Sequence, residues 1–418
     1  MSTATTGRGG FAALDACVHC GFCLQACPTF LATGDEADGP RGRIELMRAM
    51  ERGDLSADDP SLILHLDRCL ACRGCEPVCP SGVGYGHALE TARERIAERR
   101  GIPWFGRAVL WATTAPGVSR VVYAFARALR ATGLPARLAG WGRLGFGMGM
   151  LAATRADGRM GGWAARKTGT VPSANPPIRP SAALLFRGCV MDGLFSHVHE
   201  ATIRTLTVNG YDVSEVPGQG CCGALHAHAG LHAAAQEMAR INVAAFPGDA
   251  AIVVNSAGCG AMLKDYGRLL PEDPAAARFA ARVRDVTELL AERGPRQGAP
   301  LRLRVAYDAP CHLLHAQRIA TPPRQVLDAI PGLQWSETAD SAQCCGSAGL
   351  YSALQPALSR TVLLAKLERL RADPPDVLAT GNPGCAMQLG AGLRAARLAT
   401  TVLHPVELLD ASYREAGL

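Results

Sequence analysis

Two cysteine runs with the same spacing, C-x2-C-x2-C-x3-C-P, constrain the fold of this chain more than any other feature. They hold eight of the sixteen cysteines in the 418-residue sequence. The members of the two runs are Cys17, Cys20, Cys23 and Cys27, then Cys69, Cys72, Cys75 and Cys79. This spacing is typical of domains that hold two [4Fe–4S] clusters. The sequence therefore predicts a protein that carries two such clusters and transfers single electrons.

The ligands of each cluster are expected to come from both runs, because the fourth cysteine of such a run ligates the other cluster. One cluster would be held by Cys17, Cys20, Cys23 and Cys79, and the other by Cys69, Cys72, Cys75 and Cys27. A proline follows each fourth cysteine and is expected to turn the chain away from the cluster, since proline discourages helix continuation. Arg73 is expected to place a positive charge near the second cluster and to favour its reduced state.

Other uses of these cysteines fit the pattern less well. Zinc sites use cysteine pairs separated by a longer linker. Here four cysteines follow one another at short spacing, and this run occurs twice. Disulfide frameworks belong to small secreted domains, and the N-terminus lacks the apolar core of a signal peptide. No apolar stretch approaches the ~20 residues that span a bilayer. We therefore expect a cytoplasmic iron–sulfur protein, with peripheral contact at the inner face of the membrane as an open alternative.

The segment 101–180 is strongly basic, with Asp157 as its only acid. Aromatic and aliphatic side chains alternate with arginines at helical spacing, which indicates an amphipathic, surface-seeking connector. Three interpretations stay open: docking on a partner subunit, contact with a membrane surface, and ordinary connecting helices. The sequence contains no nucleic-acid recognition module, so we expect no nucleic-acid partner. Four prolines in 172–180 predict a linker at the end of this segment.

The other eight cysteines form a second repeat. Each unit has a cysteine after a β-like run, an adjacent pair followed by glycine, and a cysteine after another β-like run. The β-like runs are 182–186 and 251–254 in the first unit, and 303–307 and 376–378 in the second. The cysteines are Cys189, Cys221, Cys222 and Cys259, then Cys311, Cys344, Cys345 and Cys385. Alternation of strands and helices predicts parallel α/β sheets, with a site at the carboxyl ends of the strands.

The chemistry of this second repeat has three candidate forms: a further iron–sulfur centre, a dithiol redox site, or inert packed cysteines. Gly223 and Gly346 would let the backbone turn tightly beside each cysteine pair. Histidines follow the cysteines closely, and His312, directly after Cys311, is the first candidate for a functional role. The other candidates are His226, His228, His232 and His315.

With both repeats in view, the chain resembles the iron–sulfur subunits of bacterial glycolate oxidase (glycolate dehydrogenase) over nearly its whole length. The resemblance rests on the stretches 17–29, 38–44 and 69–85 and on the two Cys-Cys-Gly (CCG) units. It implies a mixed α+β and α/β fold: an α-helical ferredoxin-like domain with two [4Fe–4S] clusters (1–100), a connector (101–180), and two α/β cysteine-rich CCG units (181–295 and 296–418). It also implies FAD-containing glycolate oxidase partners that bear the substrate site. The expected electron acceptor is a quinone or another acceptor at the membrane.

The CCG units also resemble those of heterodisulfide reductases, with one departure. In that family a unit closes with C-x2-C and holds a five-cysteine cluster, whereas here Ser256 and Asn382 stand at the matching positions. A five-thiolate centre is therefore not expected. Two further functions remain as alternatives to electron transfer: a heterodisulfide or thiol reductase with the CCG units as its redox site, and a regulatory redox sensor. No dinucleotide-binding or Walker-type glycine motif is present.

Overall fold

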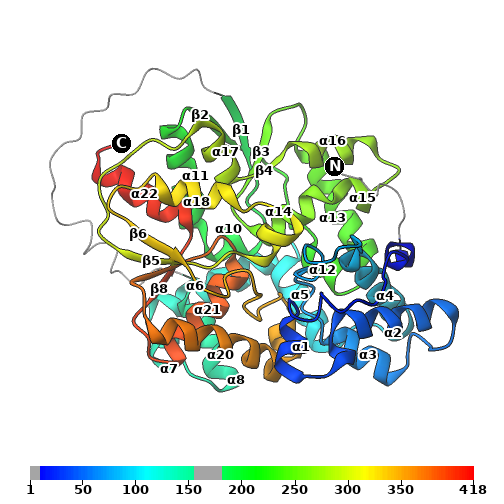
Figure 1. Cartoon of the computed structure of the whole chain (residues 1–418). Helices are drawn as coiled ribbons and strands as arrows, with labels where there is room; N and C mark the ends of the chain where they lie inside the picture. Colours follow the sequence, from blue (N-terminus) through cyan, green and yellow to red (C-terminus); the bar gives the residue numbers. More distant parts are fainter. Residues whose placement is uncertain (1–9, 155–180) are drawn as a thin grey trace.

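The computed structural model describes residues 10–154 and 181–418. A helical N-terminal domain, a helical connector and two small parallel sheets follow one another along the chain (Figure 1). The prediction of a helical cluster domain followed by two α/β units is confirmed. The predicted linker at 172–180 lies outside the described residues.

The N-terminal domain consists of short helices that surround the two cysteine runs. Pro28 occupies the first position of α1, where proline is tolerated because that N–H needs no helical partner. Leu14, Met47, Leu62, Leu66 and Leu89 form the centre of its core. The helices are η1 (Gly10–Leu14), α1 (Pro28–Thr33), η2 (Glu36–Asp38), α2 (Pro40–Arg52), α3 (Pro60–Asp67) and α4 (Tyr85–Arg100).

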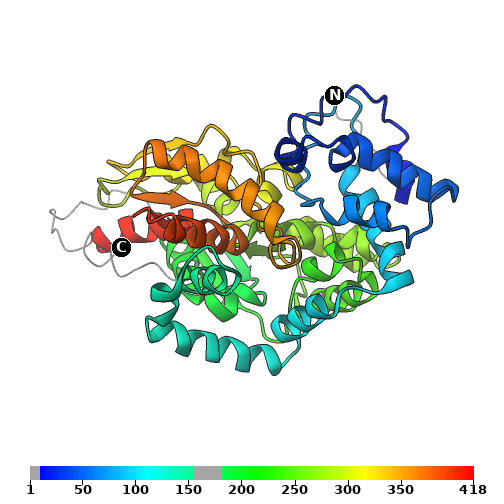
Figure 2. The same cartoon turned by 90° about the horizontal axis from the view of Figure 1, so that it is seen from below.

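The connector folds into four helices along one edge of the molecule, where α5 and α6 follow one another in cyan and teal (Figure 2). Helix α8 packs against α21 of the second sheet unit, and Gly149 allows this close approach to Ala391. In the described part of the chain no helix is long and apolar enough to cross a membrane. The connector helices are α5 (Trp104–Thr114), α6 (Val118–Ala131), α7 (Leu134–Leu138) and α8 (Arg143–Ala152).

The first CCG unit is built on a four-stranded parallel sheet of order β2-β1-β3-β4. Its strands are β1 (Ser181–Leu185), β2 (Tyr211–Glu215), β3 (Ala251–Val254) and β4 (Val283–Asp285). Its helices are α10 (Val190–Leu194), α11 (Ser196–Val208), α12 (Ala224–His228), α13 (His232–Ala245), α14 (Ala257–Lys264), α15 (Tyr266–Leu269), α16 (Pro274–Arg282) and α17 (Val286–Arg293).

The second unit repeats this topology, with four parallel strands in the order β6-β5-β7-β8. Its strands are β5 (Arg304–Tyr307), β6 (Gln334–Glu337), β7 (Val377–Ala379) and β8 (Thr401–Leu403). Its helices are the π-helical turn η3 (His312–Ala316), then α18 (Thr321–Asp328), α19 (Tyr351–Leu354), α20 (Pro356–Ala372), α21 (Pro383–Ala395) and α22 (Pro405–Glu415).

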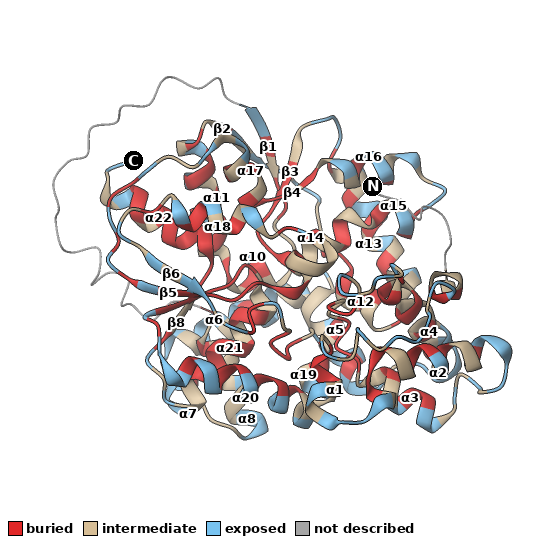
Figure 3. Ribbon diagram, viewed as in Figure 1, coloured by how far each residue is buried: buried red, intermediate tan, exposed pale blue. Residues whose placement is uncertain are grey.

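The two units pack against each other reciprocally. Helix α11, which follows the first strand of unit one, contacts α22, which follows the last strand of unit two. In the same way α17, the last helix of unit one, contacts α18, which follows the first strand of unit two. One continuous core joins both sheets across this junction, and Figure 3 shows β3 and β5 largely buried. The repeats therefore form a pseudo-twofold pair.

The N-terminal domain contacts both units. Helix α4 packs against α12 of unit one, and α1 packs against α20 of unit two. Gly230, at φ +81°, permits the first contact, because a Cβ there would lie 2.3 Å from the carbonyl oxygen of Arg93. Tyr351 of unit two donates a hydrogen bond of 2.9 Å to the carbonyl oxygen of Arg68. The cluster domain is thus fixed against the place where the two units meet.

Candidate metal centres and a shared thiol cavity

The first predicted ligand group lies at the surface of the N-terminal domain. Cys17, Cys20, Cys23 and Cys79 all line one cavity of about 30 Å³. Val18 and Phe22 line the same cavity and are 68% and 67% exposed. Cys20 is exposed as well. An approaching protein could therefore come close to this group.

The second predicted ligand group lies deeper. Cys27, Cys69, Cys72 and Cys75 all line a cavity of about 20 Å³. Cys75 lines both cavities, so the two groups adjoin. Tyr85 lies within hydrogen-bond reach of the Cys69 sulfur at 3.5 Å. The chain thus brings together the same two sets of four cysteines that the spacing predicts.

A buried arginine that the sequence reasoning missed stands beside the deeper group. Arg43 is fully buried on α2, and its Nη1 atom lies 4.0 Å from the Cys27 sulfur and 3.0 Å from the Thr29 hydroxyl. Burial acts to lower the pKa of Arg43, but the charges of Cys69, Tyr85, Cys27 and Asp38 outweigh burial and raise it. Arg43 therefore stays a cation inside the domain.

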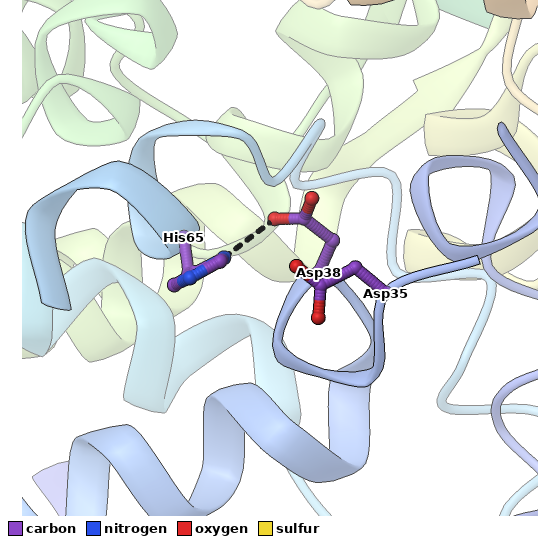
Figure 4. A group of neighbouring side chains, drawn as sticks. All are labelled: Asp35, Asp38 and His65. Atoms are coloured by element: carbon purple, nitrogen blue, oxygen red, sulfur yellow. Dashed lines mark hydrogen bonds and ion pairs between the residues drawn. The ribbon is translucent and has the colours of Figure 1, made fainter. Parts of the chain in front are cut away.

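Asp38 balances part of this charge, and Figure 4 shows its contact with His65 beside Asp35. It is fully buried and accepts from His65 Nδ1 at 2.9 Å and from Arg68 Nη1 at 2.8 Å, with Arg43 Nη2 at 3.6 Å. Asp35, Asp38 and His65 have the spacing of a small metal site. Because two guanidinium groups already surround the Asp38 carboxylate, we assign this trio a structural role as an ion-pair network.

Arg73, predicted to act near the second cluster, lines the deeper cavity. Its Nε atom donates to Glu76 at 2.9 Å, and Glu76 also accepts from the Gly86 N–H at 2.8 Å. The neighbouring carboxylate offsets the positive charge of Arg73. Arg43 is therefore the stronger source of positive potential at this group.

All eight cysteines of the CCG units line one shared cavity of about 600 Å³, which also reaches Cys69 of the N-terminal domain. The strands of each unit direct their carboxyl ends toward this cavity, as parallel sheets do at their sites. In unit one the Cys189 and Cys221 sulfurs are 3.5 Å apart, and in unit two the Cys311 and Cys344 sulfurs are 4.0 Å apart. We call this space the thiol cavity.

Two thiols of each unit lie about as close together as two ligands of a single zinc ion, but no third thiol joins them at that distance. A tetrahedral zinc ion with Zn–S bonds of about 2.3 Å holds its sulfurs only ~3.8 Å apart. Within the described residues, which include every cysteine, no three thiols lie within 4.8 Å of one another. The four-thiol sets therefore do not have the spacing of a lone tetrahedral zinc site.

Thiolate formation is favoured at one member of each adjacent pair. Hydrogen bonds from Cys189 and Cys222 lower the pKa of Cys221 well below its usual range. In unit two, hydrogen bonds from Cys344 and Cys385 do the same to the pKa of Cys345. Metal ligation needs thiolates, so Cys221 and Cys345 are the members of each pair nearer the ligating form, whereas hydrogen bonds to neighbouring thiols raise the pKa values of Cys222 and Cys344.

The glycine after each cysteine pair is required by the backbone. Gly223 has φ +83°, and a Cβ there would lie 3.2 Å from Ala235 of α13. Gly346 has φ +87°, and a Cβ there would lie 2.6 Å from the Ser359 carbonyl oxygen of α20. Only glycine adopts this left-handed conformation at low cost while the following helix packs so closely.

Ser256 and Asn382, which stand where a fifth cysteine would, both line the thiol cavity. Asn382 Nδ2 lies 3.5 Å from the Cys385 sulfur, and its Oδ1 accepts from the Gly258 N–H at 3.0 Å. The Asn382 amide therefore links the two units across the cavity and contacts a thiol.

The candidate histidines divide by position. His312 lies 3.5 Å from the Cys311 sulfur and packs on His228, with ring centroids 5.3 Å apart, and both line the thiol cavity. His228 and His232 pair with Glu90 and Glu94 of α4, at 3.3 and 2.8 Å. His315 Nε2 lies 2.7 Å from the Ala342 carbonyl oxygen, which accepts its hydrogen bond. His226 is buried beside Cys221.

The deeper N-terminal group adjoins unit two. Cys72 packs in the same apolar cluster as Cys311, Cys344 and Tyr351. Cys69 lines both the small cavity and the thiol cavity. The three thiol sites therefore form a continuous series from the exposed group to the cavity between the units.

A helical domain with two four-cysteine groups, followed by paired α/β units that share a thiol cavity, defines an iron–sulfur protein of the CCG class. Residues 13–83 match the family described as "4Fe-4S dicluster domain". Residues 183–264 and 305–390 each match the "Cysteine-rich domain" family, also called CCG. The N-terminal domain accordingly carries two [4Fe–4S] clusters.

Relatives of nearly full length share this organisation. The chain is 34% identical over 421 residues to the "Probable glycolate oxidase iron-sulfur subunit" of Bacillus subtilis (strain 168), covering 96% of this chain and 94% of the relative. It is 33% identical over 414 residues to the "Glycolate oxidase iron-sulfur subunit" of Escherichia coli (strain K12), covering 95% and 93%. The chain belongs to the family of glycolate oxidase iron–sulfur subunits.

A more distant relative shares part of the chain. One of the subunits of the fumarate reductase (CoM/CoB) of Methanothermobacter marburgensis is 33% identical over 233 residues, which cover 55% of this chain and 46% of the relative.

Proposed function

We propose that this chain is the electron-transfer subunit of a flavin-dependent glycolate (2-hydroxyacid) dehydrogenase, relaying electrons from FAD-containing partner subunits to a quinone or other membrane acceptor. The near-full-length relatives named as glycolate oxidase subunits support the substrate class. The observation that supports the relay is the continuous series of thiol sites. Cys75 lines the first and second cavities, and Cys69 lines the second cavity and the thiol cavity. Bound clusters accept and release single electrons.

The donor side is the exposed cysteine group. Val18 and Phe22 surround it with exposed apolar surface, which suits a transient contact with a flavoprotein. The cysteines hold each cluster at a fixed place, and Arg43 supplies a fixed positive charge at the deeper one. Substrate oxidation belongs to the partner subunits, and this chain is proposed to work in the cytoplasm at the inner face of the membrane.

The CCG cysteines are proposed to hold at least one further iron–sulfur centre. Their burial, their spacing and the lowered pKa values of Cys221 and Cys345 support this assignment. The ligands would be Cys189, Cys221, Cys222 and Cys259 in unit one, and Cys311, Cys344, Cys345 and Cys385 in unit two.

Iron and acid-labile sulfide analysis with EPR tests the cofactor assignment. Anaerobically purified wild type is compared with the Cys221→Ser/Cys344→Ser double variant. More than about eight irons per chain, falling to about eight in the variant, is the expected result. About eight irons in both proteins would remove the CCG units from the relay.

Co-purification tests the function against its alternative. The chain should isolate with flavoprotein subunits, and glycolate should reduce its clusters only in their presence. A heterodisulfide or thiol reductase would instead turn over a disulfide alone with a reduced dye, and the shared cavity between two thiol sets is the feature that favours it. Disulfide turnover by the isolated chain at rates matching the complex would overturn the proposed relay.

A further inference from the structure

Helices α5 and α6 expose large apolar side chains to solvent. Trp104 and Trp111 on α5 are 80% and 62% exposed, and Val121 and Phe125 on α6 are 71% and 70% exposed. Contiguous apolar surface of this kind marks a site of protein or membrane contact. We call these four residues, together with the exposed Arg107 and Arg120 of the same helices, the α5–α6 surface.

Helix α5 has a second, inward face that forms a wall of the thiol cavity. Gly106, Val109 and Thr113 follow one another at helical spacing and line that cavity. Trp104 and Trp111 lie about two helical turns apart, on the opposite side of α5, and face solvent. A single helix therefore separates the cysteine-lined space from the exposed apolar surface.

The segment that carries this surface contributes only positive charges. The sequence from 101 to 154 contains six arginines and no aspartate or glutamate. Four of these arginines are exposed and form no ion pair with any residue that the structure describes: Arg107, Arg120, Arg137 and Arg143. Tryptophan at an apolar–polar boundary with arginine on the flanks is the composition of helices that lie in the headgroup region of an anionic bilayer.

The surface is preformed because α6 is fixed to the first CCG unit. The Tyr123 ring occupies the space where a side chain at Gly193 would lie, with a Cβ there only 2.4 Å from the ring. Arg127 donates to the Gly193 carbonyl oxygen at 2.8 Å. Gly193 belongs to α10, whose N-cap is Cys189. Binding at the surface therefore needs no folding of a mobile segment.

We propose that the α5–α6 surface binds an anionic lipid bilayer, with Trp104 and Trp111 at the boundary between headgroups and acyl chains. In this orientation only α5 separates the lipid from the thiol cavity, so an apolar acceptor dissolved in the membrane comes within one helix of the cavity. The acceptor route rests on the proposed function, whereas lipid binding stands on the surface alone.

Vesicle flotation of the full chain tests the binding. Vesicles of phosphatidylethanolamine with phosphatidylglycerol should retain wild type, and vesicles of phosphatidylcholine alone should retain far less. The Trp104→Ser/Trp111→Ser variant and the Arg107→Glu/Arg120→Glu variant should each partition roughly tenfold more weakly. Ile241→Ser and Arg278→Glu alter exposed residues of α13 and α16 and should leave partition unchanged. High salt should weaken the binding of wild type.

A second readout does not depend on how variants fold. In a variant whose only tryptophans are Trp104 and Trp111, brominated lipid should quench the fluorescence on vesicle binding. The proposal is overturned if wild type partitions equally onto neutral and anionic vesicles, or if no quenching is seen. Concentration-dependent dimers that disappear in the tryptophan variant would also overturn it, because they would assign the surface to a second copy of the chain. Binding of the α5–α6 surface to a flavoprotein partner, without binding to vesicles, would overturn it as well.

A failure of lipid binding can be distinguished from a failure of the proposed electron relay. With partner subunits present, the tryptophan variant should still deliver electrons from glycolate to a water-soluble dye at the wild-type rate. Only reduction of a vesicle-embedded quinone should fall, in proportion to the loss of partition. A failed relay would abolish both reactions and leave flotation of the wild type intact.

Discussion

The Nη1 atom of Arg43 lies 4.0 Å from the Cys27 sulfur, inside a part of the N-terminal domain where both residues are buried. A fixed cation so close to a ligand stabilises added negative charge. We therefore expect Arg43→Gln to lower the reduction potential of the deeper cluster by on the order of 60 mV, which corresponds to a tenfold change in a one-electron equilibrium. EPR-monitored redox titration measures the shift.

Arg43→Lys keeps the charge and should retain most of the wild-type potential. Arg52→Gln, on the exposed end of the same helix, is the matched control and should leave the potential unchanged. Equal potentials in Arg43→Gln and wild type would show that this cation does not tune the cluster.

The contact between Gly193 and Tyr123 gives a prediction about packing. A methyl group at Gly193 would overlap the Tyr123 ring, so Gly193→Ala should destabilise the protein by about 1–3 kcal/mol. Gly147→Ala on α8 meets nothing within 4 Å and should be neutral or slightly stabilising. Calorimetric Tm values report both effects. Combining Gly193→Ala with Tyr123→Leu should recover part of the loss, and strictly additive losses would contradict the proposed overlap.

A buried ion pair gives a prediction about unit two. Lys366 donates to Asp308 and, at 2.9 Å, to the Asp340 carbonyl oxygen, and both partners of the ion pair are buried. Burial raises the pKa of Asp308 to about 7, against the opposing effect of Lys366. Lys366→Met should cost about 3–5 kcal/mol because it leaves a buried carboxyl group uncompensated. The double variant Lys366→Met/Asp308→Leu should regain most of this, as measured by chemical denaturation. A double variant as unstable as the single one would contradict the argument.

The pH dependence of stability should carry a contribution from His404. Burial lowers the pKa of His404 to about 3, so the folded protein keeps this ring neutral while the unfolded chain takes up a proton below pH 6.5. The free energy of unfolding is therefore unaffected by His404 well above pH 6.5. It decreases as the pH falls below 6.5, by about 1.4 kcal/mol at pH 5.5.

His404→Asn should remove that loss while keeping a side chain that can cap α22. The test compares the stability of wild type and variant between pH 7.5 and 5.5. Glu407, whose pKa burial raises to about 7, titrates in both proteins and so cancels in the difference. Parallel curves for the two proteins would show that His404 is not the responsible group.

The sequence predicts those features that depend on residues close together along the chain. The C-x2-C spacing defines both four-cysteine groups within a few residues, and the strands β1, β3, β5 and β7 follow from short apolar runs. The strands β2 and β6 escaped prediction because most of their residues are exposed or half-buried, which leaves no continuous apolar run.

The thiol cavity and Arg43 depend on contacts between distant parts of the chain. Arg43 meets Cys27 and the His65 carbonyl oxygen only because α2 packs against α3. The eight CCG cysteines meet because helices of each unit pack on the other unit, and periodicity within one unit carries no information about that contact. Arg73 looked like the local cation, but the sequence alone did not show its pairing with Glu76.

The reciprocal packing of α11 on α22 and of α17 on α18 is the geometry of an isologous dimer within one polypeptide. A chain with a single unit could enclose the same cavity only by self-association, and both halves would then be identical. Fusion frees the halves to diverge: Phe186 and Asp308 each stand three residues before the first cysteine of their unit, one apolar and one in an ion pair with Lys366. Covalent linkage therefore permits two chemically unequal thiol sites to face each other across one cavity, and in the proposed relay that difference would give the flow of charge a direction that perfect symmetry would forbid.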